Sequence, residues 1–262
     1  MIIPELQGKL SCQDYFLYGA CDEKYFDEFG KILISSIKKN SNDNIHIHIF
    51  NPRSDQLDFC EVNGVSFTYE YAPLDLFQPA ANKWSIVPTD PVDKHNYDRI
   101  LTAMAKGGDK SIAERIQKTY YACTRFIRLN QILDDSTTAF SIDVDAVVRT
   151  SIPKLPNDKD LYIHHITGKK ARFLAGGVYI NPRGRNFLRE YAEVLENKIS
   201  NDLIHWGLDQ DVLDPIVPKY DFGVLPIKYI DWHMTPSSYI WTAKGTRKET
   251  AEFISEQKKY IS

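Results

Sequence analysis

Two aspartates one residue apart, Asp143 and Asp145, follow the apolar run Thr138–Ile142. The run predicts a buried strand, and the carboxyl ends of strands in open α/β sheets are where ligands and metals bind. Paired carboxylates suit a hard cation such as Mg²⁺ or Mn²⁺, and such a cation commonly holds a diphosphate. The alternative is a solvated acidic turn without a ligand, because Asp-x-Asp also arises by chance.

A second polar cluster follows the first apolar run, at residues 15–18. Asp22 can accept a hydrogen bond from a ring N–H, and Tyr25, three residues later, can stack on a base. The competing interpretation makes Asp22 the N-cap of the next helix, a position that favours aspartate. Both interpretations place these residues at a strand-to-helix junction, and they differ in whether a ligand binds there.

The helix that leads into the Asp-x-Asp strand carries basic residues. Arg125 and Arg128 are three positions apart and share a helix face with Lys118. This edge could contact a phosphate or a ribose. The alternative is a solvated face paired with acids, which is the interpretation we favour for Arg128. Arg125 lies between apolar stripes, which favours a buried partner for its guanidinium.

Two later motifs offer groups that suit a sugar. Gly176 and Gly177 interrupt a predicted strand, and such glycines indicate either a close approach, for example by a sugar ring, or a bulge. Asp209 and Gln210 open a helix, where their side chains can bind vicinal hydroxyls or cap the helix. The residues alone leave both pairs of alternatives open.

The last motif lies near the end of the chain. Lys244, Arg247 and Lys248 surround Gly245 just before a predicted helix. Three cations and a glycine at a helix N-terminus can hold a diphosphate through charge and backbone N–H groups. The alternative is an exposed basic turn.

Strands and helices alternate in the first part of the chain. The apolar pattern predicts three strands, separated by two helices, at residues 15–18, 25–39, 45–50, 56–62 and 65–71. This order is typical of a parallel sheet built from βαβ units. His46 and His48 share one face of the second strand. The sequence shows no evident carboxylate partner for them, which disfavours a metal site there.

The remaining chain predicts further elements, with one interruption. Helices are expected at 111–133, 184–200, 207–217 and 246–261, and strands up to 143 and at 161–166, 173–181 and 222–230. Residues 72–110 contain four prolines and no clear periodicity. A segment of this kind predicts an irregular insert or functional loop.

The bulk composition excludes several classes of protein. The chain has 262 residues, 43% hydrophobic and 12% aromatic, enough for one α/β domain with a substantial core. A net charge of −3 gives no field to recruit nucleic acid. The four cysteines lie far apart, which argues against a zinc ribbon or disulfide framework. With no signal peptide and no transmembrane segment evident, we expect a soluble, cytoplasmic protein.

Five motifs, in one order between Tyr15 and Lys248, resemble the GT-A glycosyltransferases. They are Ala-x-Asp-x-x-Tyr, Tyr-Tyr-x-x-x-Arg-Phe before Asp-x-Asp, Gly-Gly-x-x-x-Asn, Asp-Gln-Asp and Lys-Gly-x-Arg-Lys. Within that group the chain is most similar to the retaining family 8, with its glycogenin-like and bacterial lipopolysaccharide hexosyltransferase members. The resemblance implies a single Rossmann-like α/β domain over residues 1–262, with a mainly parallel sheet flanked by helices. This domain would include the insert at 72–110 and a C-terminal segment at 231–262 that closes over the donor.

The resemblance implies roles on the nucleotide side of a donor site. The family holds its base, often uracil, with residues that match Ala20, Cys21, Asp22 and Tyr25. Arg125 falls where a basic side chain reaches the donor. Asp143 and Asp145 match the carboxylates that bind Mn²⁺ or Mg²⁺, and Val144 matches the residue that touches the ribose.

The resemblance also implies roles on the sugar and phosphate side. The wall beside the donor sugar matches Gly176 and Gly177, and the pair that reads sugar hydroxyls matches Asp209 and Gln210. Lys244 matches the lysine that holds the diphosphate, and Arg247 is a further cation beside it.

The metal site departs from the family pattern. The family takes its third metal ligand from the histidine of a His-x-x-Gly-x-x-Lys segment, and here Thr242 stands in the corresponding stretch. The nearest histidine is His233. It is therefore the candidate third ligand, the alternative being two carboxylates completed by phosphates and water.

The residues and the resemblance together predict a metal-dependent transfer of a hexose from a nucleotide sugar, with UDP favoured. The resemblance implies catalytic roles for Asp209, Gln210 and Lys244. The acceptor is a hydroxyl of a glycan, a lipid-linked molecule or a protein, and retention follows from the resemblance. One alternative is a sugar-nucleotide-forming nucleotidyltransferase, although the turn at Asp22 and Glu23 is acidic where that reaction normally needs a basic glycine-rich loop. Another is a non-catalytic carbohydrate- or protein-binding module.

Overall fold

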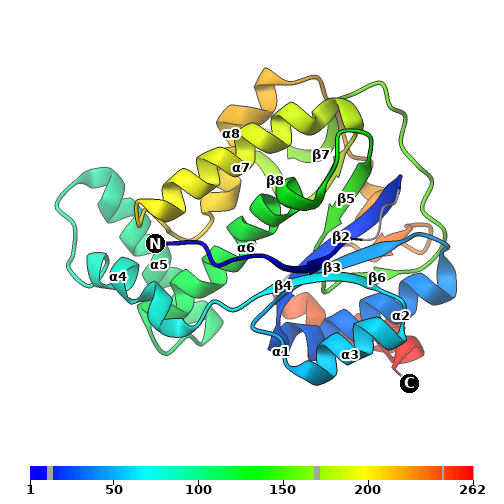
Figure 1. Ribbon diagram of the computed structural model, residues 1–262, viewed down its shortest axis with the longest axis horizontal. Helices are drawn as coiled ribbons and strands as arrows, with labels where there is room; N and C mark the ends of the chain where they lie inside the picture. Colours follow the sequence, from blue (N-terminus) through cyan, green and yellow to red (C-terminus); the bar gives the residue numbers. More distant parts are fainter. Residues whose placement is uncertain (11–13, 168–171, 244, 262) are drawn as a thin grey trace.

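The computed structural model describes residues 1–10, 14–167, 172–243 and 245–261. Within them an eight-stranded sheet has the order β1-β4-β3-β2-β5-β8-β7-β9 (Figure 1). Its strands are β1 Gln7–Lys9, β2 Tyr15–Asp22, β3 Ile45–Phe50, β4 Ser66–Glu70, β5 Thr138–Ile142, β7 Leu161–Ile166, β8 Arg172–Ile180 and β9 Phe222–Val224. Two short strands, β6 Val147–Val148 and β10 Ile240–Trp241, pair antiparallel beside it. The expected α/β architecture is confirmed.

The sheet is parallel from β4 to β5, whereas β1 pairs antiparallel with β4 at one edge and the strands beyond β5 are mixed. β2 pairs in parallel with β3 and with β5, and β3 pairs in parallel with β4. β8 runs antiparallel between β5 and β7. Because β2 and β5 are parallel neighbours, their carboxyl ends lie at the same edge of the sheet. This edge therefore brings Asp22 near the aspartates that follow β5.

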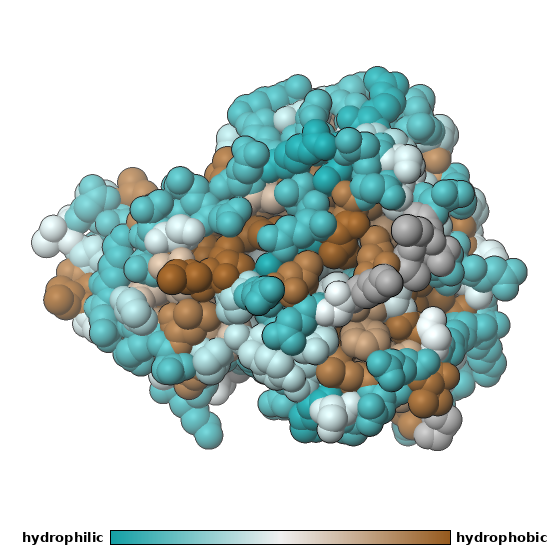
Figure 2. All heavy atoms as spheres, in the orientation of Figure 1, coloured by the Kyte–Doolittle hydropathy of each residue, from teal (hydrophilic) through white to brown (hydrophobic). Residues whose placement is uncertain are grey.

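Helices cover both faces of the sheet (Figure 1). They are α1 Glu23–Tyr25, α2 Lys31–Asn40, α3 Ser54–Val62, α4 Gln78–Lys83, α5 Pro91–Gly107, α6 Ile112–Ile132, α7 Arg185–Ser200, α8 Leu208–Ile216 and α9 Ala251–Gln257. In β2, Phe16 and Tyr18 join the core with α6, α7 and α8, whereas Leu17 joins the core with α2 and α3. Alternate side chains of β2 thus pack against the helices on opposite faces of the sheet. The outer sides of α7 and α8 are mainly hydrophilic (Figure 2).

The expectation of an irregular insert at residues 72–110 is wrong, because the segment contains α4 and the 17-residue helix α5. Pro79 and Pro91 lie in the first turns of these helices. Proline is tolerated there, since an N–H at that position would have no intrahelical partner. Asp90 caps α5, and Gly108, with a left-handed φ of 66°, ends it. Pro79 and Pro91 therefore mark helix starts rather than breaks.

The C-terminal part is less regular than expected over residues 222–230, and it is helical from Gly245 onward. The strand expected at 222–230 ends at Val224, and a 3₁₀ turn follows at Ile227–Tyr229. Pro226 precedes this turn and has no N–H with which to extend a ladder. The tail is helical as expected, with a 3₁₀ turn at Gly245–Glu249 before α9.

Two expectations from composition can be compared with the structure. The described cysteines, Cys21, Cys60 and Cys123, are buried free thiols, and Cys12 lies outside the described residues. Across residues 1–10, 14–167, 172–243 and 245–261, no helix has both the length and the apolar character that crossing a bilayer requires.

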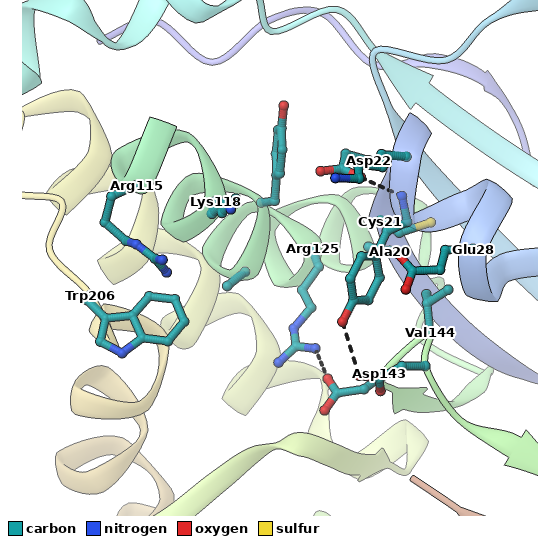
Figure 3. Close-up of a pocket in the computed structure, with 15 residues that line it drawn as sticks. Ala20, Cys21, Asp22, Glu28, Arg115, Lys118, Arg125, Asp143, Val144 and Trp206 are labelled. Carbon is teal, nitrogen blue, oxygen red and sulfur yellow. Dashed lines mark hydrogen bonds and ion pairs between the residues drawn. The ribbon is translucent and has the colours of Figure 1, made fainter. Parts of the chain in front are cut away.

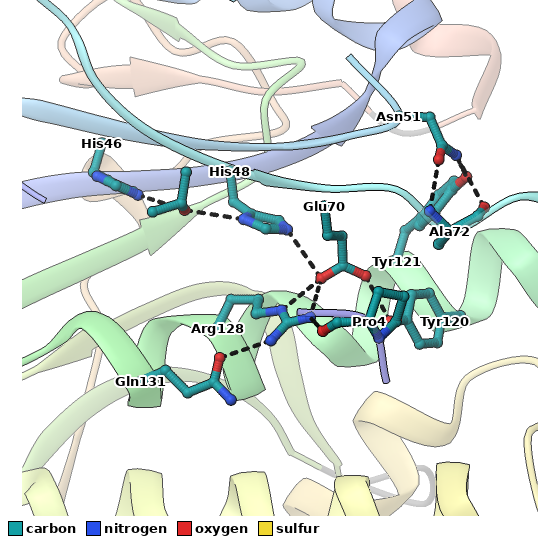
Figure 4. Close-up of polar contacts among 11 residues, drawn as sticks. Pro4, His46, His48, Asn51, Glu70, Ala72, Tyr120, Tyr121, Arg128 and Gln131 are labelled. Atoms are coloured by element: carbon teal, nitrogen blue, oxygen red, sulfur yellow. Dashed lines mark hydrogen bonds and ion pairs between the residues drawn. The ribbon is translucent and has the colours of Figure 1, made fainter. Parts of the chain in front are cut away.

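Arg128 is buried, so the expectation of a solvated position is wrong. Its Nε donates to Oε2 of Glu70 at 2.5 Å, and its Nη1 donates to Oε1 of Gln131 at 2.8 Å (Figure 4). The Tyr120 hydroxyl donates to Oε1 of Glu70 at 2.5 Å, and Nε2 of His48 lies 3.5 Å from Oε2. Since Glu70 belongs to β4 and His48 to β3, this network fastens α6 to the sheet. Strands of the sheet cover the face of α6 that carries Arg128. The pattern of residues within the helix does not show that this face is buried.

Candidate active site

A cavity of about 480 Å³ opens at the sheet edge where β2 and β5 end (Figure 3). Its lining includes residues that the sequence assigned to a nucleotide and a metal: Ala20, Cys21, Asp22, Tyr25, Arg125, Asp143, Val144 and Asp145. They come from β2, α1, α6 and the loop after β5. Parallel pairing of β2 with β5 thus brings together residues that are far apart in the sequence.

Arg125 connects the elements of the cavity wall. Its Nη1 donates to Oδ1 of Asp143 at 2.7 Å (Figure 3), and its Nη2 donates to the carbonyl of Ala175 at 2.8 Å. The same Nη2 lies 3.7 Å from Oδ2 of Asp209. Burial by itself would lower the pKa of Arg125, but the charges of Asp143 and Asp209 raise it, so the guanidinium stays charged. One buried cation therefore links α6, β8, α8 and the end of β5.

Asp145 is buried, and both of its carboxylate oxygens have partners. Oδ1 accepts a hydrogen bond from the Thr242 hydroxyl at 3.2 Å, and Oδ2 accepts one from the Tyr25 hydroxyl at 3.3 Å. The ammonium of Lys248 lies 2.5 Å from Oδ2 and also donates to the Tyr25 hydroxyl. Burial and the charge of Asp143 raise the pKa of Asp145, whereas Lys248 lowers it. The direct contact favours the ionised pair.

In the sequence Lys248 belongs to the basic turn, and the resemblance implies the diphosphate role for Lys244 instead. Lys244 lies outside the described residues. Counted from Thr242, the spacing Thr242-x-x-Gly245-x-x-Lys248 matches the family segment His-x-x-Gly-x-x-Lys, with threonine in place of histidine. This spacing is the sequence signal that identifies Lys248, and the structure places that lysine against Asp145.

Two of the predicted residues lie away from the aspartate pair. His233 is exposed, and its backbone N–H donates to Oδ1 of Asp231 at 2.7 Å. Arg247 is also exposed and donates to the carbonyl of Trp232 at 3.1 Å. The ring of His233 packs near that of Trp232, with centroids 6.2 Å apart. The structure therefore brings neither predicted residue to the pair in this arrangement.

The residues around Asp143 and Asp145 do not fit a metal ion in this arrangement. In the part of the chain that the structure describes, no group of three His, Cys, Asp or Glu side chains is placed to hold an ion. Arg125 engages Asp143, and Lys248 engages Asp145, so a cation already lies against each carboxylate. Thr242 offers a neutral hydroxyl where the family resemblance implies an imidazole ligand.

The two glycines of β8 make room for neighbouring protein atoms. A Cβ on Gly176 would lie 2.7 Å from Oδ2 of Asp143, and one on Gly177 would lie 2.4 Å from Cδ1 of Ile230. The register of β7 with β8 shifts between Ile163 and His164, opposite these glycines, so the strand also carries the bulge that the sequence left as an alternative. Gly176 thus allows Asp143, and Gly177 allows Ile230, to lie close against β8.

The junction after β2 acts as a helix cap. Oδ1 of Asp22 accepts the backbone N–H of Tyr25 at 2.8 Å, which makes Asp22 the N-cap of α1. The ring of Tyr25 lies 4.7 Å from that of Phe29, measured between centroids, and its hydroxyl points to Asp145. In this arrangement Tyr25 belongs to the cluster around Asp145, while Asp22 lines the cavity.

A second cavity, of about 170 Å³, contains Asp209 and Gln210 together with Arg99, Arg172 and Trp206. Trp206 lines both cavities and lies in Figure 3 at the end away from Asp22. Its side chain is 42% exposed, and the guanidinium of Arg115 lies over its ring, 4.6 Å from the centroid. The sequence argument did not single out Trp206, although a tryptophan just before Asp209 is a usable signal.

Comparison with known proteins identifies the fold. No family model and no curated protein sequence matches the chain. Among solved structures, the apo form of the glycosyltransferase GlyE of Streptococcus pneumoniae matches with a TM-score of 0.52 and 11% identity, over 94% of this chain and 60% of that chain. At this identity the likeness shows the fold alone. Together with the sheet order, it shows that the chain has a GT-A glycosyltransferase fold.

Two further structures are similar at lower scores. Mouse xyloside xylosyltransferase 1, in its apo form, matches with a TM-score of 0.45 and 11% identity, over 89% of this chain and 98% of that chain. The galactosyltransferase LgtC, in complex with donor and acceptor sugar analogues, matches with a TM-score of 0.47 and 11% identity, over 94% and 96% of the two chains.

Proposed function

We propose that this protein transfers a glycosyl unit from a nucleoside diphosphate sugar to an acceptor hydroxyl. The observation that carries the proposal is the meeting of Asp143 and Asp145 with two cations, Arg125 and Lys248, at the cavity where β2 and β5 end. Such a site suits a substrate that carries both a diphosphate and hydroxyl groups. The GT-A fold supports this function by analogy.

The donor nucleotide is placed along the end of β2. Ala20, Cys21 and Asp22 would contact the base, and Val144 the ribose. Asp22 uses one oxygen to cap α1, and its other oxygen can accept from a ring N–H of a base. Uracil has such an N–H and adenine has none, so UDP is favoured over ADP. The diphosphate would then extend toward Lys248.

The chain's own residues suit the charges that develop during transfer. The bond from the anomeric carbon to the diphosphate breaks, a bond to the acceptor oxygen forms, and the sugar becomes oxocarbenium-like between the two. The proton of the acceptor hydroxyl would pass to an oxygen of the departing diphosphate. The leaving diphosphate gains negative charge, which Lys248 would offset from its position on Asp145. Asp209 and Gln210 would orient the sugar from the adjoining cavity. Retention is proposed from the family resemblance, without an assigned nucleophile.

The acceptor is placed at the opposite end of the cavity, at Trp206. Its indole is backed by Arg115, which itself donates to the carbonyl of Ala103 at 2.9 Å and pairs with Asp109. The contact with Arg115 fixes the exposed Trp206 ring between the two cavities. The ring therefore offers a flat apolar face beside polar groups, and a pyranose ring binds to surfaces of this kind. Of the acceptor classes that the sequence left open, we therefore favour a glycan.

The test is a panel of UDP-, GDP- and ADP-sugars with oligosaccharide acceptors, with and without Mn²⁺, read by mass spectrometry of the products. Transfer from a UDP-sugar is expected, and Asp145→Asn is expected to abolish it. The matched control is Asp58→Asn, because Asp58 is exposed on α3. Formation of a UDP-sugar from UTP and a sugar 1-phosphate, without transfer, would favour a nucleotidyltransferase. Nucleotide binding without any turnover would favour a binding module.

A further inference from the structure

Lys248 occupies the oxygen of Asp145 to which a divalent cation held by the aspartate pair would bind. Its ammonium is 2.5 Å from Oδ2 of Asp145, and a Mg²⁺ ion bound by that carboxylate would coordinate at about 2.0–2.1 Å. The two cations cannot occupy the same side of one carboxylate. The second oxygen of Asp145 accepts from Thr242 at 3.2 Å, so it too is engaged.

The ammonium is held by more than this ion pair. It donates to the hydroxyl of Tyr25, and it lies 4.7 Å from the ring centroid of Tyr25 and 5.1 Å from that of Phe29. Aromatic faces attract a cation, and the attraction strengthens when the cation is partly desolvated. The side chain of Lys248 is 24% exposed. These contacts fix the position of the Lys248 side chain, unlike that of a lysine extending into solvent.

The segment that carries Lys248 is anchored to the rest of the domain. The 3₁₀ turn Gly245–Glu249 lies between β10 and α9, and Phe253 of α9 is fully buried. Beyond α9, the Tyr260 hydroxyl accepts from Nδ2 of Asn40 on α2 at 2.8 Å. The tail therefore packs against the first layer of helices and presents Lys248 to Asp145.

Charge balance is already close without a divalent ion. Asp143, Asp145 and Asp209 are three carboxylates, and the described cations in contact with them are Arg125 and Lys248. Each member of the aspartate pair has a cation within hydrogen-bonding distance. A divalent ion would have to displace an ammonium that is already placed, and Thr242 would add only a neutral hydroxyl to its ligands.

We propose that Lys248 serves as the built-in counter-cation of the aspartate pair, so that the protein binds a nucleoside diphosphate without a divalent metal ion. This inference rests on the proposed function for its substrate class, but its central claim concerns cations alone. In the donor complex the ammonium would pair with both Asp145 and a diphosphate oxygen, since an ammonium has three donors.

The first experiment measures Mn²⁺ binding by electron paramagnetic resonance, without any nucleotide. The wild-type protein is expected to bind no Mn²⁺ at micromolar concentration. Lys248→Met is expected to bind one ion, because the variant leaves a buried carboxylate without its cation. Adding Asp145→Asn to that variant is expected to abolish binding again. The matched control, Lys258→Met, changes an exposed lysine on the same tail and should behave as wild type.

The second experiment measures UDP affinity by calorimetry with Mn²⁺ or with EDTA. For the wild type, we expect the two dissociation constants to agree within about twofold, well below the tenfold that 1.4 kcal/mol represents. Lys248→Met in EDTA should weaken binding by about 10- to 100-fold, the effect of losing one charge-assisted hydrogen bond. Lys248→Arg keeps the charge and should retain most of the affinity.

The outcomes separate this inference from the proposed function. Tight Mn²⁺ binding by the wild type, loss of UDP binding in EDTA, or no gain of Mn²⁺ binding in a folded Lys248→Met variant would each overturn the inference. If Lys248→Met does not fold, the wild-type measurements still decide. If the cation results hold but no sugar nucleotide supports transfer, the proposed function fails and the cation assignment stands.

Discussion

Replacing Arg128 by methionine is expected to destabilise the protein by several kilocalories per mole. The side chain of Arg128 is 2% exposed and that of Glu70 is 0% exposed, with Nη2 of the arginine 2.5 Å from Oε2 of the glutamate. The substitution leaves the Glu70 carboxylate in the interior, with the Tyr120 hydroxyl and Nε2 of His48, 3.5 Å from Oε2, as its remaining partners. Removing one partner of a buried ion pair lowers the free energy of unfolding by about 3–5 kcal/mol. Since native proteins are stable by about 5–15 kcal/mol, this is a large share.

The assay is urea unfolding followed by circular dichroism, with Arg53→Met as the control. Arg53 is 46% exposed and pairs with Asp27 at 2.6 Å and Asp55 at 3.0 Å. Exposed pairs contribute about 0–1 kcal/mol, so the control should lose little. The double variant Arg128→Met/Glu70→Gln removes both buried charges and should lose less than the two single variants together, by roughly 0.5–3 kcal/mol.

The reasoning would be refuted if Arg128→Met cost no more than Arg53→Met, or if the two buried substitutions were additive. Either result would mean that burial of the charge pair does not set the cost. The thermal readout is independent of the denaturant: a loss of 3–5 kcal/mol should lower the Tm by about 6–20 °C in a domain of this size.

Four further predictions concern the site and its surroundings. Asp143→Asn is expected to abolish transfer while the circular dichroism spectrum stays unchanged, and full turnover by this variant would contradict the assignment. Calorimetry should show tighter binding of UDP than of ADP, and equal affinities would remove the role of Asp22 in base recognition. Trp206→Ala should raise the KM for a glycan acceptor by about tenfold and leave the Kd for UDP unchanged. Trp206→Phe keeps an aromatic ring and should raise the KM less. An unchanged KM in Trp206→Ala would exclude Trp206 as the surface on which the acceptor sugar packs. Burial lowers the pKa of His46 from about 6.5 to about 3. Below pH 6.5 the unfolded chain therefore takes up a proton at this histidine that the native state does not. The free energy of unfolding should fall from pH 6.5 toward pH 3 by at most about 1.4 kcal/mol per pH unit, and His46→Asn should flatten this slope.

Local sequence patterns were sufficient for most elements of the fold. The strands expected at 45–50 and 161–166 have those bounds in β3 and β7, and the helix expected at 111–133 is α6, Ile112–Ile132. Apolar periodicity is a local property, so the chain shows it without knowledge of its partners. The pattern failed at residues 72–110, where prolines in the first helical turn resemble breakers.

The sequence by itself determined which chemical groups are available: the Asp-x-Asp after a buried strand, the acidic turn after β2, and a late cluster of cations. Only the tertiary structure decided which of these groups meet. Lys248 contacts Tyr25, 223 positions away, and Arg125 contacts both Asp143 and Asp209. Such contacts are set by the parallel pairing of β2 with β5 and by the packing of the C-terminal tail on α2. They depend on where distant segments pack, which the local order of side chains does not encode.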